Sequence, residues 1–204
     1  MTTKKNKTTT IEIKVVILII LILSAFLIML SVENIKIDKE KNLYETILYS
    51  NARIIEAGDL EKKANEYYNL ASFDYEEQNY KLVEINCMKA RDYYSDASQE
   101  YLTIRSELLS SNINDKLIDI EIERLNLISE IQLNMYEACE HFESAVRYYD
   151  FYYNTDVPYD DMSYEMGGGE IDSMNEKIRL HDENIRIHNK LLSDYEVELK
   201  KRIE

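Results

Sequence analysis

Helix-breaking residues are scarce in this chain, and their positions constrain the fold more than any other feature. The 204 residues include four Gly and one Pro. Pro158 lies in the same segment as Gly167, Gly168 and Gly169, whereas Gly58 stands alone. The chain is also rich in Glu, Lys, Leu, Ile and Tyr and has no alternating strand pattern. These features predict an all-α fold.

Between the breakers, apolar residues recur at helical spacing. Gly58 suits the C-terminal cap of one helix and Asp59 the N-terminal cap of the next, while Gln78-Asn79 has the composition of a turn. Residues 154–171 are expected to form an irregular loop. The predicted helices cover about 33–57, 60–77, 80–110, 115–153 and 172–203.

The expected helix 172–203 has the clearest apolar stripe, whose positions alternate steps of four and three, the spacing of helices packed side by side at shallow angles. Short turns make neighbouring helices antiparallel. We therefore expect residues 33–204 to form an elongated antiparallel helical bundle, with a self-associating coiled coil as the alternative use of the stripes. The predicted inward residues are Leu43, Tyr44, Ile47, Leu48, Ile54 and Ile55; Val83, Cys87, Ala90, Tyr94, Ala97, Tyr101, Ile104 and Leu108; Leu125, Ile128, Met135, Cys139, Phe142, Val146 and Tyr149; and Met174, Ile178, His181, Ile185, His188, Leu192, Tyr195 and Leu199.

Residues 15–32 form one uncharged apolar run, VVILIILILSAFLIMLSV. A helix of this length spans about 27 Å, close to the hydrocarbon thickness of a bilayer. We expect a transmembrane signal-anchor helix here. A cleaved signal peptide is the alternative, but cleavage requires small residues at the first and third positions before the cut, and residues 29–32 place a bulky residue at one or both of them. A buried core helix is a further alternative.

Charge is unevenly divided along the chain. Residues 1–14 form a basic tail with a net charge of +3, so the remainder must carry −18 to reach the total of −15. The tail predicts a cytoplasmic N-terminus and an extracytoplasmic C-terminal domain. An acidic domain is a poor nucleic-acid binder. A solvated surface accounts for the charge, and the alternative is binding of cations or of a basic partner.

Residues 64–95 resemble a single tetratricopeptide repeat, a helix–turn–helix unit with fixed small and large positions. The matching positions are Tyr67, Leu70, Ala71 and Ala90. The departures from the pattern are Asp74, Val83, Cys87 and Ser95. The resemblance covers 32 of the 204 residues, and it implies a peptide- or protein-binding scaffold rather than an enzyme.

No catalytic, cofactor or metal constellation stands out, and we expect none. His181 and His188 lie about 10.5 Å apart along a helix axis, too far for one metal ion. We interpret them as semi-buried polar residues that fix the helix register, with pH sensing as an alternative. Cys87 and Cys139 lie on inward stripes and are interpreted as small buried hydrophobes, although outside the cytoplasm they could pair as a disulfide.

Tyrosine is unusually abundant, with seventeen Tyr and no Trp. Packing in the bundle accounts for most of these rings, and the alternative is an aromatic-rimmed surface for a partner or ligand. The end that leads into the acidic loop 154–171 is where we expect contacts, because long loops often carry function. The predicted partner-contact residues are Tyr148, Tyr149, Tyr152, Tyr153, Tyr159 and Tyr164.

Two function classes fit these features. The first is a non-enzymatic, single-pass, membrane-anchored helical module that binds a protein partner, or other copies of itself, at the membrane surface. The second is an extracytoplasmic sensor or ligand-binding bundle. The sensor would need a partner subunit, because the fourteen-residue tail holds no output domain. The sequence does not identify a small-molecule ligand.

Overall fold

The computed structural model describes residues 3–154 and 161–203, with side chains from Leu23 onward except those of Ala25, Asp161 and Ile203. Its elements are the helices α1 (Thr3–Glu76), α2 (Tyr80–Ser110), α3 (Lys116–Asn154) and α4 (Asp161–Ile203). The predicted all-α fold is confirmed. The chain divides into two compact units, Met1–Thr46 and Ile47–Glu204.

The first unit is the N-terminal part of α1. Between Leu23 and Ile37 its large apolar side chains are exposed, from 40% at Leu30 to 68% at Met29. No stretch of the described residues is both long and apolar enough to span a bilayer. The predicted anchor, residues 15–32, lies partly outside the described side chains, at residues 15–22 and Ala25.

Helix α1 continues through Gly58, so the predicted break there, between helices 33–57 and 60–77, is wrong. A Gly inside a helix costs roughly 0.5–1 kcal/mol relative to Ala. That cost is small beside the packing around it, since Ala57 and Ala64 are both fully buried. A single Gly with a helical backbone therefore does not end this helix.

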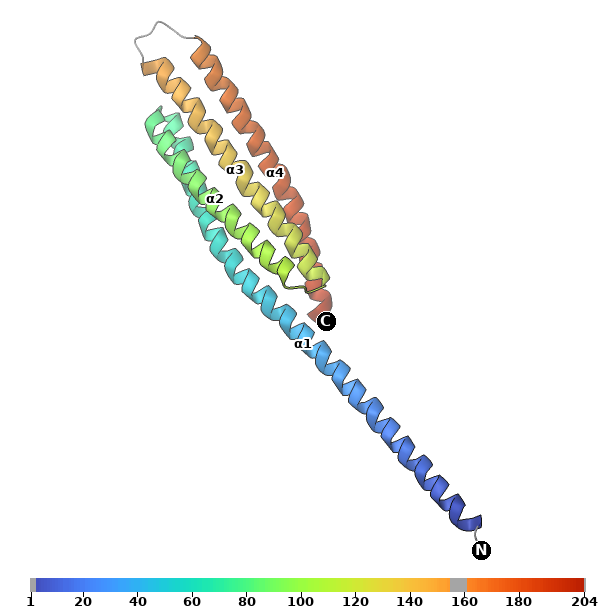
Figure 1. Ribbon diagram of the computed structural model, residues 1–204. Helices are drawn as coiled ribbons and strands as arrows, with labels where there is room; N and C mark the ends of the chain where they lie inside the picture. The colour runs from blue at the N-terminus through green and yellow to red at the C-terminus, as the bar shows by residue number, and fades with distance from the viewer. Residues whose placement is uncertain (1–2, 155–160, 204) are drawn as a thin grey trace. The chain divides into compact units, whose positions relative to one another are not determined.

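The second unit is a four-helix bundle built from residues 47–76 of α1 together with α2, α3 and α4. Successive helices run in opposite directions, and α3 lies between α2 and α4 (Figure 1). α3 packs on α1, α2 and α4 and buries sixteen residues, whereas α2 packs on α1 and α3 and buries eight. The antiparallel bundle expected from the short turns is confirmed for this unit.

The predicted stripes of α2 and α3 are confirmed at every position: all eight in α2 and all seven in α3 are buried. The predicted stripe of α4 is half-buried, and its Tyr195 is buried. α1 differs from the prediction, because Leu48 is 75% exposed and Ile55 is 69% exposed. Its buried positions in the bundle are small residues seven apart, Ser50, Ala57, Ala64 and Ala71.

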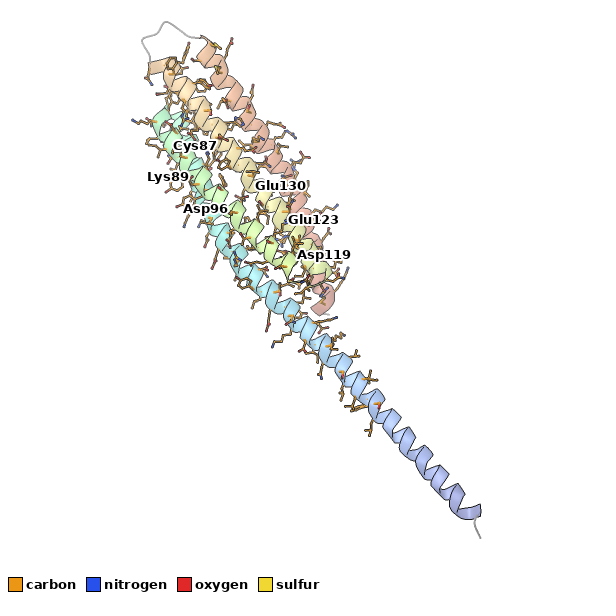
Figure 2. The ribbon with its side chains drawn as sticks, in the orientation of Figure 1. Cys87, Lys89, Asp96, Asp119, Glu123 and Glu130 are labelled. Atoms are coloured by element: carbon orange, nitrogen blue, oxygen red, sulfur yellow. The ribbon has the colours of Figure 1, made fainter. Side chains whose placement is uncertain are left out.

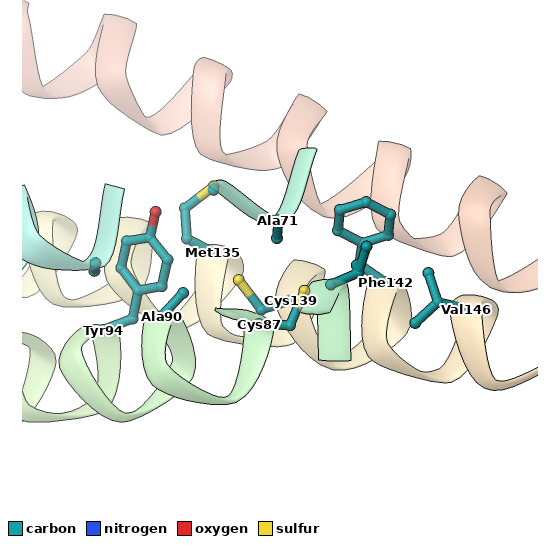
Figure 3. Packing of buried hydrophobic residues seen from close by; sticks show 10 residues of the cluster. Ala71, Cys87, Ala90, Tyr94, Met135, Cys139, Phe142 and Val146 are labelled. Carbon is teal, nitrogen blue, oxygen red and sulfur yellow. The ribbon is translucent and has the colours of Figure 1, made fainter. Parts of the chain in front are cut away.

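The core of the bundle joins side chains from α1, α2 and α3, and Figure 3 shows how they interlock. Tyr94 is 1% exposed, and its hydroxyl donates a hydrogen bond of 2.6 Å to the side-chain oxygen of Asn65. This bond satisfies the polar atom of an otherwise buried ring. Ile171 and Met174 of α4 pack against the same core.

Two connections are short and hydrogen-bonded. In residues 77–79, Gln78 adopts a left-handed backbone with φ 60°, and the Asn79 N–H donates to the Asp74 carbonyl at 2.8 Å. In residues 111–115, the Asp115 carboxylate caps α3 by accepting a hydrogen bond of 2.9 Å from the Leu117 N–H. The third connection includes residues 155–160, which lie outside the described residues.

Helix α4 begins at Asp161, so the predicted irregular loop 154–171 is wrong from residue 161 onward. Gly167, Gly168 and Gly169 are helical, although each Gly disfavours a helix by about 1 kcal/mol. Packing of the first turns of α4 opposes that cost, since Ser163 and Gly167 are buried. The three glycines therefore belong to a helix and not to a flexible connector.

Charged side chains lie at the helix interfaces and on the outer surface. Arg53 of α1 pairs with Glu100 and Glu107 of α2, and Arg91 of α2 pairs with Glu143 of α3. Many other charges are exposed, and Figure 2 labels Lys89, Asp96, Asp119, Glu123 and Glu130 among them. These exposed charges agree with the solvated surface expected from the composition.

Candidate functional site

Six tyrosine rings gather at the end of the bundle where α1 turns into α2 and α3 approaches α4. All four helices contribute, because the antiparallel topology places the 77–79 turn and the α3–α4 connection at the same end (Figure 1). We call these six residues the tyrosine cluster. Its members are Tyr75, Tyr80, Tyr149, Tyr152, Tyr153 and Tyr164.

Tyr149 of α3 holds the inner part of the cluster together. Its ring centroid lies 6.3 Å from those of Tyr75 and Tyr80 and 5.6 Å from that of Tyr164. Tyr75 also meets the ring of Phe142 edge-on at 5.3 Å, and Phe142 belongs to the bundle core. The cluster is thus continuous with the core, and each well-placed ring pair adds about 0.5–1.5 kcal/mol beyond its buried area.

The outer part of the cluster contains Tyr152 and Tyr153 of α3. The ring of Tyr153 stacks on that of Tyr80 with centroids 6.2 Å apart. Tyr152 meets Tyr153 edge-on at 4.9 Å and Tyr164 at 5.4 Å. The outer rings of α3 therefore contact rings from two other helices, Tyr80 of α2 and Tyr164 of α4.

Gly167 explains how α4 approaches so closely. A Cβ atom at this position would lie 2.7 Å from Cε1 of Tyr149, nearer than side-chain carbons normally come. The ring of Tyr149 thus occupies the space that any other residue at position 167 would need. Added Cβ atoms at Gly168 and Gly169 would meet nothing within 4 Å. Of the three glycines, Gly167 is the one that this packing requires.

The inner phenols are neutral at physiological pH. Burial raises the pKa of Tyr149 to about 12, and it also raises the pKa of Tyr75 and Tyr80 above the ordinary value of 10.0. A neutral phenol keeps its proton, so each hydroxyl can donate a hydrogen bond as well as accept one. The cluster offers aromatic faces and hydroxyl groups but no charge of its own.

The outer edge of the cluster is exposed. Tyr153 is 59% exposed and Tyr164 is 51% exposed, whereas Tyr149 is only 8% exposed. Adjoining turns of α3 and α4 add the exposed side chains Phe151, Met162 and Met166. We call the exposed rim the five residues Phe151, Tyr153, Met162, Tyr164 and Met166.

The structure brings four of the six predicted contact residues together, namely Tyr149, Tyr152, Tyr153 and Tyr164. Tyr148 is half-buried and has no described ring contact with this group, and Tyr159 lies outside the described residues. Sequence reasoning missed Tyr75 and Tyr80. Both flank the predicted Gln78-Asn79 turn, and an antiparallel bundle places that turn at the end where α3 meets α4. Their position beside this turn could therefore have predicted that Tyr75 and Tyr80 join the tyrosines of α3.

The two cysteines are free, buried and adjacent in the core (Figure 3). The hydrogen bond between the two thiols and burial both raise the pKa of Cys87. Both cysteines therefore pack as small hydrophobes, as the sequence interpretation has it. Their pairing as a disulfide stays a prediction.

The histidines lie apart from the tyrosine cluster or at its margin. His141 Nδ1 lies 2.6 Å from a carboxylate oxygen of Glu170, across the α3–α4 interface. His181 and His188 are half-buried on α4, in agreement with their interpretation as semi-buried polar residues. Within the described part of the chain, no group of three or more His, Cys, Asp or Glu residues is placed to hold a metal ion.

A group of buried polar side chains lies farther along α3 and α4, away from the tyrosine cluster. The guanidinium of Arg124 pairs with Glu121 and lies 5.4 Å from the ring centroid of Tyr195. Burial and then the charge of Arg124 lower the pKa of His188, and burial raises the pKa of Glu121. The ion pair lies within α3, and the contact of Arg124 with Tyr195 links α3 to α4.

The chain matches no family model, no curated protein and no solved structure. The resemblance of residues 64–95 to a tetratricopeptide repeat gains no support from these comparisons. A helical hairpin does occupy those residues, but α2 continues to Ser110 and α1 begins far upstream of residue 64. The assignment of residues 64–95 as a repeat unit stays a prediction.

Proposed function

We propose that this chain is a single-pass membrane protein whose helical bundle acts as a non-enzymatic interaction module and binds a protein partner through the exposed rim. The observation that carries the proposal is the contrast within the tyrosine cluster. Tyr149 is buried against the core, whereas Tyr153 and Tyr164 are more than half exposed. The rim is thus an aromatic surface held in place by the fold.

Such a surface suits protein recognition on physical grounds. Tyr, Phe and Met are enriched at protein interfaces, and contiguous exposed apolar patches mark interaction sites. The exposed ring of Tyr153 is already oriented by its stacking on Tyr80. A preoriented ring loses little conformational freedom on binding, so more of the contact energy appears as affinity.

The membrane attachment rests on the apolar run at residues 15–32, which contains no charged residue. The described part of the run is supporting evidence, because its apolar side chains from Leu23 to Val32 are exposed. Lipid would cover these side chains and remove the cost of exposing them to water. The four Lys residues in the tail favour a cytoplasmic N-terminus with the bundle on the other side of the membrane.

The partner proposal is tested by affinity purification of the full-length chain from detergent-solubilised native membranes. The test variant carries Tyr153→Ser and Tyr164→Ser, which remove two exposed rings. The control is Tyr49→Ser, because Tyr49 is also 59% exposed and lies outside the tyrosine cluster. We expect co-purifying proteins with the wild type and the control and their loss with the test variant. Equal recovery in all three would contradict a role for the rim.

The membrane proposal is tested separately on the same preparations. We expect the wild-type chain to resist extraction from membranes by alkaline carbonate and its bundle to be digested by protease added outside the cell. Ile28→Lys, which places a charge in the apolar run, should weaken attachment. A wild-type chain released fully by carbonate would contradict an integral anchor.

One observation favours a ligand-binding bundle as a second candidate. A groove of about 350 Å³ lies between α2 and α3. Its lining residues are Tyr94, Ser95, Ser98, Gln99, Leu102, Leu133 and Tyr136. A thermal-melting screen of the full-length chain against small molecules tests this candidate. A stabilising compound whose effect disappears in Leu102→Trp, which would fill the groove, would support it.

A further inference from the structure

We infer that the segment of the partner seated on the exposed rim is cationic, with Lys or Arg side chains between apolar ones. This inference rests on the proposed function and adds the chemistry of the partner. Its basis is the juxtaposition of exposed tyrosine rings with carboxylates at one end of the bundle.

The charges around the rim are predominantly negative. Residues 76–81, 150–154 and 162–166 contain the carboxylates of Glu76, Glu77, Asp150 and Glu165, and one cationic side chain, that of Lys81. All five of these charged residues are exposed. Asp150 lies close enough to the cluster for its charge to raise the pKa of Tyr80. An acidic segment would be repelled here, whereas a basic one would be attracted.

Tyrosines elsewhere in this chain accept cationic side chains against their rings. Five described tyrosines outside the cluster have a cationic group within 6 Å of the ring centroid. The pairs are Arg53 with Tyr49, Lys63 with Tyr93, Lys89 with Tyr67, Arg91 with Tyr136, and Arg124 with Tyr195. The negative face of each ring thus receives a cation from the chain itself.

The rim offers the same ring chemistry to an outside cation. Tyr153 and Tyr164 each expose more than half of their surface, and the carboxylates of Asp150 and Glu165 lie within one helical turn of them. A Lys or Arg side chain at the rim could lie against a ring face and pair with a carboxylate at once. Phe151, Met162 and Met166 add exposed apolar side chains on the same turns of α3 and α4. The rim therefore matches a basic segment that also carries apolar residues.

The nearest competing explanation is general attraction to an acidic protein, since the whole chain has a net charge of −15. Matched variants separate the two. The rim-charge variant carries Asp150→Asn and Glu165→Gln, and the rim-ring variant carries Tyr153→Ser and Tyr164→Ser. The charge control carries Asp96→Asn and Glu123→Gln, two exposed carboxylates away from the rim (Figure 2). Both charge variants change the net charge equally.

The experiment measures binding by fluorescence anisotropy, with the full-length chain in a zwitterionic detergent. The probes are a labelled peptide of Lys, Arg and Leu, the same peptide with Gln at each cationic position, and the same peptide with Glu there. We expect the cationic peptide to bind at least about tenfold more tightly than the Gln peptide and the Glu peptide to bind least. Added salt should weaken the binding of the cationic peptide, because salt screens exposed charges.

The variants show whether the cationic peptide binds at the exposed rim. Both rim variants should lower the affinity for the cationic peptide several-fold, while the charge control and Tyr49→Ser should leave that affinity unchanged. Equal loss in the rim-charge variant and the charge control would overturn the inference in favour of general attraction. Equal affinity for the cationic and Gln peptides, or no binding of any peptide, would also overturn it.

Failure of this inference is distinguishable from failure of the proposed function. If native partners still depend on Tyr153 and Tyr164 in the affinity purification, the rim binds a partner of other chemistry and the proposed function stands. If native partners are retained by the rim-ring variant, the proposed function fails whatever the peptides do.

Discussion

Replacing Gly167 by Ala tests whether the tyrosine cluster is packed against α4 as tightly as the geometry indicates. The added methyl carbon would lie 2.7 Å from Cε1 of Tyr149 and 3.0 Å from Cδ1 and Cζ of the same ring. The ring cannot easily move aside, because it is 8% exposed and contacts Tyr75, Tyr80 and Tyr164. Either the ring or α4 must shift.

Two effects of opposite sign determine the result. Inside a helix, Ala is favoured over Gly by about 0.8–1.0 kcal/mol. Inserting a methyl group into a filled site costs about 1–3 kcal/mol. We therefore expect Gly167→Ala to lower the free energy of unfolding by up to about 2 kcal/mol. The neighbouring Gly168→Ala and Gly169→Ala meet no atom within 4 Å, and they should raise it by up to about 1 kcal/mol.

The assay is urea unfolding of the full-length chain in mild detergent, followed by far-UV circular dichroism and by the near-UV signal of the tyrosines. The Gly168 and Gly169 variants are the matched controls, since all three substitutions have the same intrinsic helix propensity effect. If Gly167→Ala stabilises the chain as much as these controls do, the ring of Tyr149 does not fill the space above residue 167. The described packing of the cluster would then be wrong.

Three further predictions concern the interior of the bundle. Arg91→Ala removes an ion-pair partner of Glu143, whose side chain is 7% exposed. It should lower the free energy of unfolding, measured in urea, by about 1–3 kcal/mol. The control Arg179→Ala should have little effect, because the partners of Arg179 lie on its own helix. Because burial and Arg124 lower the pKa of His188 in the folded chain, the unfolded chain binds that proton first. Stability should therefore fall as pH drops from about 7 to 5. His188→Gln should flatten this part of the stability curve, and an unchanged curve would contradict the assignment. Both core cysteines should resist a thiol reagent in the folded chain and react fully in denaturant, because they are buried; rapid labelling of the folded chain would contradict their burial.

The core positions of α2 and α3 could be predicted closely because their apolar residues recur at helical spacing along both helices. Both bury that stripe against neighbours on the inside of the bundle, so pattern and burial coincide. α1 was predicted less well, since its buried positions within the bundle are Ser50 and three alanines, seven residues apart, although the predicted Leu43 is buried. Small residues give a weak apolar signal, and the large exposed side chains of Leu48 and Ile55 obscured it.

The glycines misled the sequence prediction in two places. Gly58 was interpreted as a helix end and the run from Gly167 to Gly169 as part of an irregular loop, yet both lie within helices. Helix propensity amounts to about 1 kcal/mol per Gly, and packing of the surrounding turns outweighs it. At Gly167 the absence of a side chain is itself the packing feature, and that becomes visible only when Tyr149 is placed opposite.

The tyrosine cluster could be predicted in part. The tyrosines at the end of α3 were found because they are close together in sequence and lead into an acidic segment. Tyr75 and Tyr80 could not be joined to them by sequence spacing, since their contacts with Tyr149 cross between helices. Only the antiparallel topology places these rings at the same end.

The central claim is that the exposed rim is where this chain meets a protein partner at the membrane. It is tested most directly by replacing Tyr153 with a photoreactive phenylalanine derivative, irradiating intact membranes and identifying adducts by mass spectrometry. Tyr49, which is equally exposed and lies outside the tyrosine cluster, carries the same probe in the control. We predict a protein adduct from position 153 that is absent from position 49. No adduct at position 153, or the same adduct from both positions, would contradict the account.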